Sequence, residues 1–352
     1  MGYVIISEYA LQIAFWLCVI SATLSIIILL EVMWLRFKNV YQENYRKNFI
    51  KNWQPVLVQR ALGENAALPA LDAGEIDYFL ILWLHFQESL LGAPREHLNA
   101  VVHELNLSRE LKKRLHKGSI AKRMVAISSF GYLRDESAWN ELVHLVQSPA
   151  LTLSILSASA LANINPQKAA PVIFPIIAER RDWPAPKIAR ILKESPEILT
   201  SFLQFIEKSL HEKRPYLIRL LRLLHVQNLN QSPFYIRDIL DHSKDSELIL
   251  AALKLVREPR DLDLVRKRLR DESWQVRVQA VKMLGQLGDK QDVASLVPLL
   301  SSKDWWLRYR AASAIKAMPF LKKIDFEQIK ASLTDRYALE MFEYASAQKD
   351  SI

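Results

Sequence analysis

Histidine and glutamate side chains near residue 100 are the first candidates for chemistry, because these residue types bind zinc and transfer protons. The segment LGAPREHLNAVVHEL places Glu96, His97, His103 and Glu104 on or near one predicted helix. Successive helical residues are rotated by roughly 100°, so positions 97 and 103 point in directions about 240° apart. A metal ion needs ligands that converge, and these side chains diverge. We therefore expect a solvated helix face here and no metal site.

The rest of the chain lacks the motifs of the common catalytic and cofactor sites. Its eight histidines are scattered, and no His-Glu-x-x-His run is present. A single cysteine, Cys18, offers no Cys pair for zinc and no disulfide framework. Eight glycines in 352 residues form no phosphate-binding pattern. We accordingly predict no catalytic residue, no cofactor and no metal ligand, and a protein that is not an enzyme.

Tryptophan and arginine gather in the last third of the chain, and both residue types are enriched at binding hot spots. Trp305 and Trp306 are adjacent, so on a helix one is expected in the core and the other nearer the surface. Two interpretations remain open. Trp274 and Trp305 could wedge between stacked repeats, or this region could bind a partner. The second interpretation gives Trp306, Arg310, Arg266 and Arg270 as the protein-binding residues.

Internal repeats predict the elements that carry these residues. Residues 120–164 align without a gap with residues 274–318. A shorter period of 31 residues lies within the second block, where WQVRVQA and WWLRYRA share the pattern Trp-x-x-Arg-x-x-Ala. Each unit reads as two helices with apolar residues at helical spacing, joined by a short turn with Gly and Asp. Neither helix pair can bury its apolar face alone, so neighbours must stack. The predicted fold is an all-α solenoid.

The runs DESWQVRVQAVKMLGQLGD and KDWWLRYRAASAIKAM resemble HEAT repeats, in particular the short variety shared with phycobilisome-lyase-type proteins. The resemblance is strong over residues 118–165 and 245–318, weaker over 166–244, and weakest over 54–117. It implies a HEAT-like superhelix.

The same resemblance implies a role for the recurrent arginine, which in the family commonly bonds an acid at the preceding turn. Arg277 follows Asp271 and Arg308 follows Asp304, while Ser154 replaces the arginine in another copy. We therefore predict that Arg277, Arg308, Asp271 and Asp304 are structural residues of the repeats.

The N-terminal segment is apolar enough to cross a membrane. Residues 9–30 form an uncharged run of 22 residues, which as a helix spans about 33 Å and matches a hydrocarbon core of about 30 Å. No Lys or Arg precedes the run and no small-residue cleavage site follows it, which favours an uncleaved anchor over a signal peptide. Basic residues lie on its C-terminal side: Arg36, Lys38, Arg46, Lys47 and Lys51. This predicts a single-pass protein with its N-terminus outside and its bulk in the cytoplasm.

Small residues follow one side of this predicted span. Ala14, Cys18 and Ala22 recur at every fourth position, and Ser21 and Ser25 lie beside them. Such a row lets a second membrane helix approach closely. The alternative is that small residues are simply common in membrane helices.

These observations divide the chain into four parts: a transmembrane anchor (1–35), a basic juxtamembrane connector (36–53), an N-terminal helical cap (54–117) and a HEAT-like array (118–345). The net charge is +9, of which residues 1–53 contribute +2. This mild excess suits a position near an anionic inner leaflet and does not by itself indicate nucleic-acid binding.

The predicted function is that of a scaffold or accessory subunit at the bacterial inner membrane, bound to a protein partner that is itself an integral membrane protein. The architecture resembles companions of membrane glycosyltransferases that make envelope polysaccharides or exopolysaccharides, which implies such an enzyme as the partner. Two alternatives stay open: a lyase-like or other enzyme that uses the repeat groove, and a nucleic-acid-binding array. No cofactor is predicted, and a small-molecule ligand stays unknown.

Overall fold

The computed structural model describes residues 2–211, 216–227 and 229–347; in the first helix it describes side chains from Phe15 onward, apart from Cys18. This part of the chain contains α-helices and short 3-10 turns and no strand. The predicted all-α fold is therefore confirmed. Contacts between residues divide the chain into two compact units, Met1–Leu133 and Arg134–Ile352.

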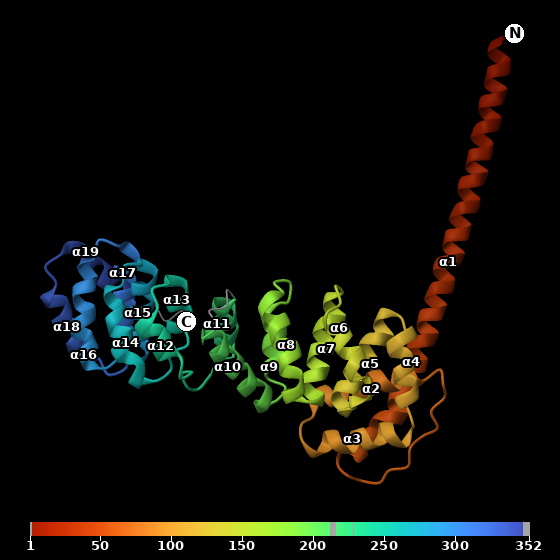
Figure 1. Cartoon of the computed structure of the whole chain (residues 1–352). Coiled ribbons are helices and arrows are strands. Elements are labelled where there is room, and N and C mark those ends of the chain that lie inside the picture. The colour runs from red at the N-terminus through yellow and green to blue at the C-terminus, as the bar shows by residue number, and fades with distance from the viewer. Residues whose placement is uncertain (1, 212–215, 228, 348–352) are drawn as a thin grey trace. The chain divides into compact units, whose positions relative to one another are not determined.

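The first unit is dominated by one very long helix. Its helices are α1 (Gly2–Ala61), α2 (Ile76–Ser89), α3 (Ala93–Glu104), α4 (Ser108–Lys117) and α5 (Ile120–Leu133). The apolar part of α1, drawn in red in Figure 1, has a mean hydropathy of 2.3, and none of it is buried by other parts of the protein. This helix is long and apolar enough to cross a membrane.

The C-terminal end of α1 belongs to the core of the first unit. Phe49, Trp53, Leu57 and Ala61 are buried at every fourth position, which places them on one face of the helix. The Trp53 ring lies edge-on to Phe79 of α2, with centroids 4.9 Å apart. The segment predicted as a basic connector is thus helical, and from Phe49 onward it packs into the unit.

A hydrogen bond fixes α1 further toward its N-terminus. The Tyr45 hydroxyl donates to Glu75 Oε1 at 2.6 Å, and this bond to a carboxylate raises the pKa of Tyr45 to about 12. The apolar run and the packed end therefore belong to a single helix that is held at several points along its second half.

The second unit is a stack of helix pairs. Its helices are α6 (Trp139–Val146), α7 (Leu151–Ile164), α8 (Pro166–Glu179), α9 (Ala185–Leu192), α10 (Pro196–His211), α11 (Leu217–His225), α12 (Ile236–His242), α13 (Ser246–Leu253), α14 (Leu262–Lys267), α15 (Trp274–Leu287), α16 (Lys290–Leu296), α17 (Trp305–Ala317), α18 (Lys323–Ser332) and α19 (Arg336–Ala347), with 3-10 turns η1 (Glu136–Ala138), η2 (Pro259–Asp261), η3 (Arg268–Arg270) and η4 (Val297–Ser301). From α7 to α19 each odd-numbered helix packs on the next odd-numbered one, and even-numbered helices pack beside them. In Figure 1 they follow in chain order from yellow-green to blue. This arrangement is the predicted α-solenoid.

Polar side chains set where several of these helices begin. Asn165 accepts a hydrogen bond from the backbone of Lys168 at the start of α8, and Asp245 accepts two at the start of α13. Asp289 and Asp292 form a reciprocal capping box at the start of α16. Each satisfies amide groups that the first helical turn leaves without a partner.

Gly285 allows α15 and α17 to approach closely. A Cβ atom added at Gly285 would lie 2.7 Å from both Cα and Cβ of Ala314. Neither atom is the end of a flexible side chain, so the backbone of one helix would have to move. The pair of small residues therefore fixes the distance between neighbouring repeats.

We predict that Gly285→Ala lowers stability although alanine is the better helix former. The gain in helix propensity is about 1 kcal/mol, whereas overpacking costs about 1 to 3 kcal/mol. Urea unfolding of the detergent-solubilised chain, followed by circular dichroism, measures the difference. Gly74→Ala is the control, because a Cβ atom there meets nothing within 4 Å. Equal or higher stability of Gly285→Ala would contradict the close approach.

Candidate protein-binding surface

Arginine side chains bind the C-terminal ends of the even-numbered helices and their 3-10 extensions. Arg277 of α15 donates from Nη1 to the carbonyl oxygens of Asp271 (2.9 Å) and Glu272 (3.0 Å), which directly follow η3. Its Nη2 donates to the Asp304 carboxylate of the next repeat at 2.6 Å. One guanidinium thus caps the preceding helix end and joins the following repeat.

Arg308 repeats this geometry 31 residues later. Its Nη1 donates to the carbonyl oxygens of Ser302 (2.7 Å) and Lys303 (3.4 Å), which directly follow η4. In both repeats the two residues whose carbonyls accept these bonds precede the arginine by six and five positions. The resemblance implied that Arg277 bonds the acid of Asp271 and Arg308 that of Asp304. The acceptors are instead backbone carbonyls, and Asp304 accepts from Arg277.

In the copy in which serine replaces the arginine, an arginine from later in the chain binds the equivalent carbonyl. Arg180 follows α8 and donates from Nη1 to the carbonyl of Ser148 (2.7 Å) and to the hydroxyl of Ser154 (2.9 Å). Ser148 lies six residues before Ser154, the same offset as in the later repeats. The carbonyl is therefore capped in all three copies, by a different arginine in this one.

Two more arginines do the same between neighbouring repeats. Arg219 of α11 donates to the carbonyls of Ile177 (3.1 Å) and Arg180 at the end of α8. Arg268 of η3 donates to the carbonyls of Leu240 and Ser243 at the end of α12. Helix C-termini leave carbonyls without partners and attract cations, so these arginines satisfy the ends that the fold exposes.

The two arginines predicted to bind a partner from the basic run differ in their surroundings. Arg266 Nε donates to Asp292 Oδ1 at 2.6 Å and its Nη2 donates to Asp292 and Asp289. The hydrogen bond with Asp292 raises the pKa of Arg266, and the Asp292 side chain is only 1% exposed. Arg270 is exposed, with no ion pair among the described residues. Arg266 is thus held by α16, and Arg270 is available to a partner.

Aromatic side chains form an exposed ridge along the N-terminal ends of three successive odd-numbered helices. This aromatic ridge consists of Trp274 of α15, Trp305 and Trp306 of α17, and Tyr337 of α19, which are 42%, 47%, 53% and 67% exposed. The Trp305 and Trp306 rings meet edge to face with centroids 4.8 Å apart. The sequence led us to expect one of these two in the core, and both are at the surface. Tyr337 was missed, although it stands 31 residues after Trp306.

Arg310 lies one turn after Trp306 on α17. Its guanidinium carbon is 5.9 Å from the centre of the Tyr309 ring, and the Tyr309 ring stacks on Trp305 at 5.4 Å. Trp306 and Arg310 therefore share one helix and one group of rings. Arg266 and Arg270 come from α14 and η3 and contribute no contact to this group among those the structure records.

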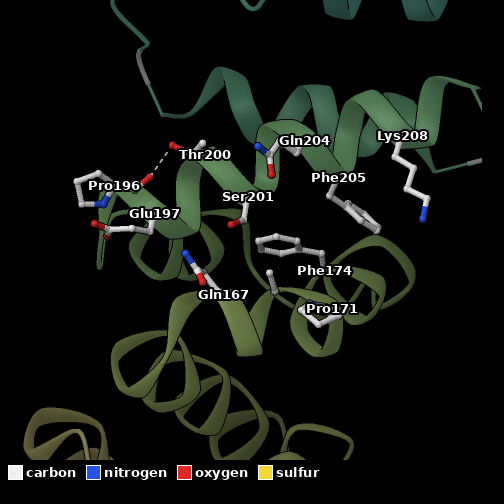
Figure 2. A pocket seen from close by; sticks show the side chains of 11 residues that line it. Gln167, Pro171, Phe174, Pro196, Glu197, Thr200, Ser201, Gln204, Phe205 and Lys208 are labelled. Carbon is white, nitrogen blue, oxygen red and sulfur yellow. Dashed lines mark hydrogen bonds between the residues drawn. The ribbon is translucent and has the colours of Figure 1, made fainter.

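A groove between α8 and α10 is the clearest hollow between two even-numbered helices (Figure 2). Its volume is about 670 Å³. Figure 2 shows Phe174 and Pro171 on one wall facing Ser201, Gln204 and Phe205 on the other. The Thr200 hydroxyl donates a hydrogen bond to the carbonyl oxygen of Pro196 at 2.9 Å. In the described part of the chain no three His, Cys, Asp or Glu side chains gather where they could hold a metal ion.

The small residues predicted for membrane contact lie on the exposed part of α1. Ala22, Ser21 and Ser25 are all exposed. The Ser25 hydroxyl donates to the carbonyl of Ser21 at 2.8 Å, so it is satisfied within its own helix and presents a compact surface. The side chains of Ala14 and Cys18 lie outside those that the structure describes. Contact of this row with another helix stays a prediction.

We predict that Arg277→Met lowers the free energy of unfolding by about 1 to 3 kcal/mol, because it removes charged hydrogen bonds to carbonyls at a helix end. The matched change Arg270→Met removes an exposed cation and should alter stability by less than about 0.5 kcal/mol. Urea unfolding of both variants measures the difference. Equal stability of the two would show that the carbonyl bonds of Arg277 contribute nothing to the repeat.

Comparison with known protein families agrees with the repeat geometry. The family model for HEAT repeats matches residues 236–319, which run from the start of α12 to just past the end of α17. No curated protein matches the chain. Repeats of this kind form helical scaffolds that mediate protein interactions and are generally not catalytic.

Proposed function

We propose that this protein is a membrane-anchored scaffold, an accessory subunit whose repeat array binds a partner protein at the cytoplasmic face of a bacterial inner membrane. The observation that carries the proposal is the single helix α1, in which no described side chain of the apolar run is buried, whereas the last turns from Phe49 onward pack against Phe79 and its neighbours. Such a helix joins a lipid phase to a folded domain without a flexible linker.

The exposed apolar surface of α1 is too large for a protein in water. Residues from Phe15 to Leu35 include long runs of exposed Ile, Leu and Trp. Monomeric soluble proteins rarely expose apolar patches larger than a few hundred Å², and transfer of such surface from water contributes about 25 cal/mol per Å². Lipid is the environment that satisfies both this surface and the helical backbone.

The basic residues that follow the apolar run support a cytoplasmic position of the array. An anchored array meets its partner within the membrane plane, which raises the effective concentration of the two proteins. The aromatic ridge supplies exposed Trp and Tyr next to Arg310, the residue types that dominate binding energy at interfaces.

We further propose that the partner is an integral membrane enzyme of the glycosyltransferase type that makes envelope polysaccharide. The row of Ala14, Cys18, Ala22, Ser21 and Ser25 would contact a membrane helix of this partner. Support for this part comes from the architecture, a single N-terminal apolar helix followed by a HEAT-type array.

Charged residues at the centre of the apolar run should release the protein from the membrane. Each Asp at the centre of a membrane helix costs about 2.5 to 3.5 kcal/mol, so Ile20→Asp with Leu24→Asp should move the chain from the alkali-resistant membrane pellet to the supernatant. Val40→Asp is the control, because Val40 is exposed to a similar degree on the same helix. Equal fractionation of both variants would contradict the anchor.

The single cysteine makes the orientation measurable. After Cys18→Ala the chain has no thiol, so cysteine can be placed at Ser7 or at Asn65. We expect a membrane-impermeant maleimide to label intact cells at position 7 and to label position 65 only after lysis. The reverse pattern would overturn the proposed topology.

Loss of a ring from the aromatic ridge should weaken partner binding while the fold stays intact. Truncation of a central hot-spot Trp costs about 2 kcal/mol or more of binding energy, so Trp306→Ala should release the partner that co-purifies with the tagged wild-type chain in mild detergent. Phe234→Ala is the control, because Phe234 is an exposed ring far from the ridge in sequence. Equal recovery of the partner by both variants would exclude the ridge as the binding surface.

A further inference from the structure

The C-terminal ends of four successive odd-numbered helices enclose a second surface feature, which we call the basic groove. It has a volume of about 720 Å³ and is lined by residues of α11, α13, α15 and α17 and the turns that follow them. Its lining consists of His225, Lys254, Val256, Arg257, Gln279, Lys282, Met283, Gly285, Gln286, Leu287, Ala317 and Pro319. On α15 and α17 the aromatic ridge lies at the opposite ends of the helices.

The basic groove holds positive charge without counter-charge. Lys254, Arg257 and Lys282 line it, and none of the lining side chains in the described chain is acidic. The ammonium groups of Lys254 and Lys282 have no carboxylate partner among the described residues, and both side chains are exposed. Elsewhere in the unit the arginines of α12 and α14 pair with Asp carboxylates of the next repeat. The groove therefore gathers cations without a carboxylate in its lining, whereas Arg237 and Arg266 are each paired with an acid.

The favourable interaction of a cation with the helix dipole accounts for one of the two groove lysines and not for the other. Lys254 is the C-terminal cap residue of α13, where a cation complements the helix dipole. Lys282, in contrast, lies five residues before the end of α15, outside its last turn. The dipole therefore does not account for Lys282, which lines the same groove as Lys254.

Backbone contacts orient the side chains of Arg257 and His225 in the groove. Arg257 Nη1 donates to the carbonyls of Lys254 (2.9 Å) and Val256 (2.8 Å), which leaves its Nε and Nη2 without a described partner. His225 Nδ1 lies 3.0 Å from the carbonyl of Lys254. Burial, followed by the charges of Arg257, Lys254 and Lys282, lowers the pKa of His225, so the imidazole is neutral at pH 7 and the positive charge belongs to the other three.

The shape and the lining of the groove indicate which kind of anion it fits. Packed helices lie about 8 to 10 Å apart, and an extended chain rises about 3.3 Å per residue, so every third residue of a bound peptide meets the next repeat. Gln279 and Gln286 offer amide groups to a peptide backbone, and Met283 and Pro319 offer apolar contact. Apart from His225 the lining contains no ring on which a base could stack, which disfavours single-stranded nucleic acid.

We propose that the basic groove binds an extended acidic segment of a partner protein, in which one carboxylate meets Lys254 and Arg257 after α13 and another, about three residues away, meets Lys282 of α15. This inference rests on the proposed scaffold function and adds the chemistry of the partner. The partner would contact the array at both ends of the same helices, through rings at one end and carboxylates at the other.

A synthetic peptide tests the proposal with the full chain in detergent micelles. The probe is a fluorescein-labelled peptide of about twelve residues, roughly 40 Å when extended, with Glu at every third position and Ser or Gly between. Fluorescence anisotropy measures its affinity. The same peptide with Gln in place of Glu is the control, and we expect it to bind at least about tenfold more weakly, which corresponds to about 1.4 kcal/mol.

Matched lysine variants locate the binding. Lys254→Gln with Lys282→Gln removes two exposed charges from the groove and should weaken binding of the Glu peptide by about tenfold. Lys244→Gln with Lys303→Gln removes two exposed charges that lie just before α13 and α17, at the ends of these helices away from the groove, and should change it by less than about twofold. Equal weakening by both double variants would show that only net charge attracts the peptide and would overturn the proposal.

Other results separate this inference from the proposed function. Equal binding of the Glu and Gln peptides would overturn the inference, as would tighter binding of a single-stranded oligonucleotide that also depends on Lys254 and Lys282. Either result leaves the anchor untouched, because membrane extraction of the Asp variants measures that separately. If the Asp variants fractionate like the control while the Glu peptide still binds, only the membrane part of the proposed function is contradicted.

Discussion

The bonds between arginine side chains and backbone carbonyls at helix ends are the interaction on which the second unit depends. An α-helix leaves its last carbonyls without partners, and the short even-numbered helices of a repeat array present such ends at every repeat. Arg180, Arg219, Arg268, Arg277 and Arg308 bind them at α6, α8, α12, η3 and η4. Because Arg219, Arg268 and Arg277 come from other helix pairs than the ends that they bind, these bonds also help to set how the helix pairs stack.

This use of arginine decides which charges are left for recognition. A guanidinium that spans two carbonyls, or a carbonyl and a carboxylate as in Arg277, is committed to the fold. Arg266 is likewise committed to the buried carboxylate of Asp292. Lysine lacks the planar fork and serves poorly in such bidentate sites. Lys254 and Lys282 of the groove have no such partner among the described residues, so composition alone does not show which cations are left for recognition.

The sequence predicted the fold well and the roles of single residues less well, for a physical reason. The pattern Trp-x-x-Arg-x-x-Ala places a helix start, a recurrent arginine and a small contact residue, and the structure has α15 and α17 at these positions. A sequence shows side chains and hides backbone carbonyls, so an acid near Arg308 looked like its partner while the acceptors were Ser302 and Lys303. Exposure of both Trp305 and Trp306 was hidden as well, because a 31-residue period does not say which neighbour covers a helix start. The basic groove joins residues from four helices, and no local spacing could have indicated it.

The same constraint bears on how the proposed scaffold would recognise a partner through its surface. Helices are held at their ends by arginine and in close contact by pairs such as Gly285 and Ala314. A preorganised surface of this kind loses little conformational freedom on binding, and the membrane would remove much of the remaining translational cost by confining both partners to one plane. Binding energy can then come from a few rings and a few charges, which is what the exposed ends of α15 and α17 carry.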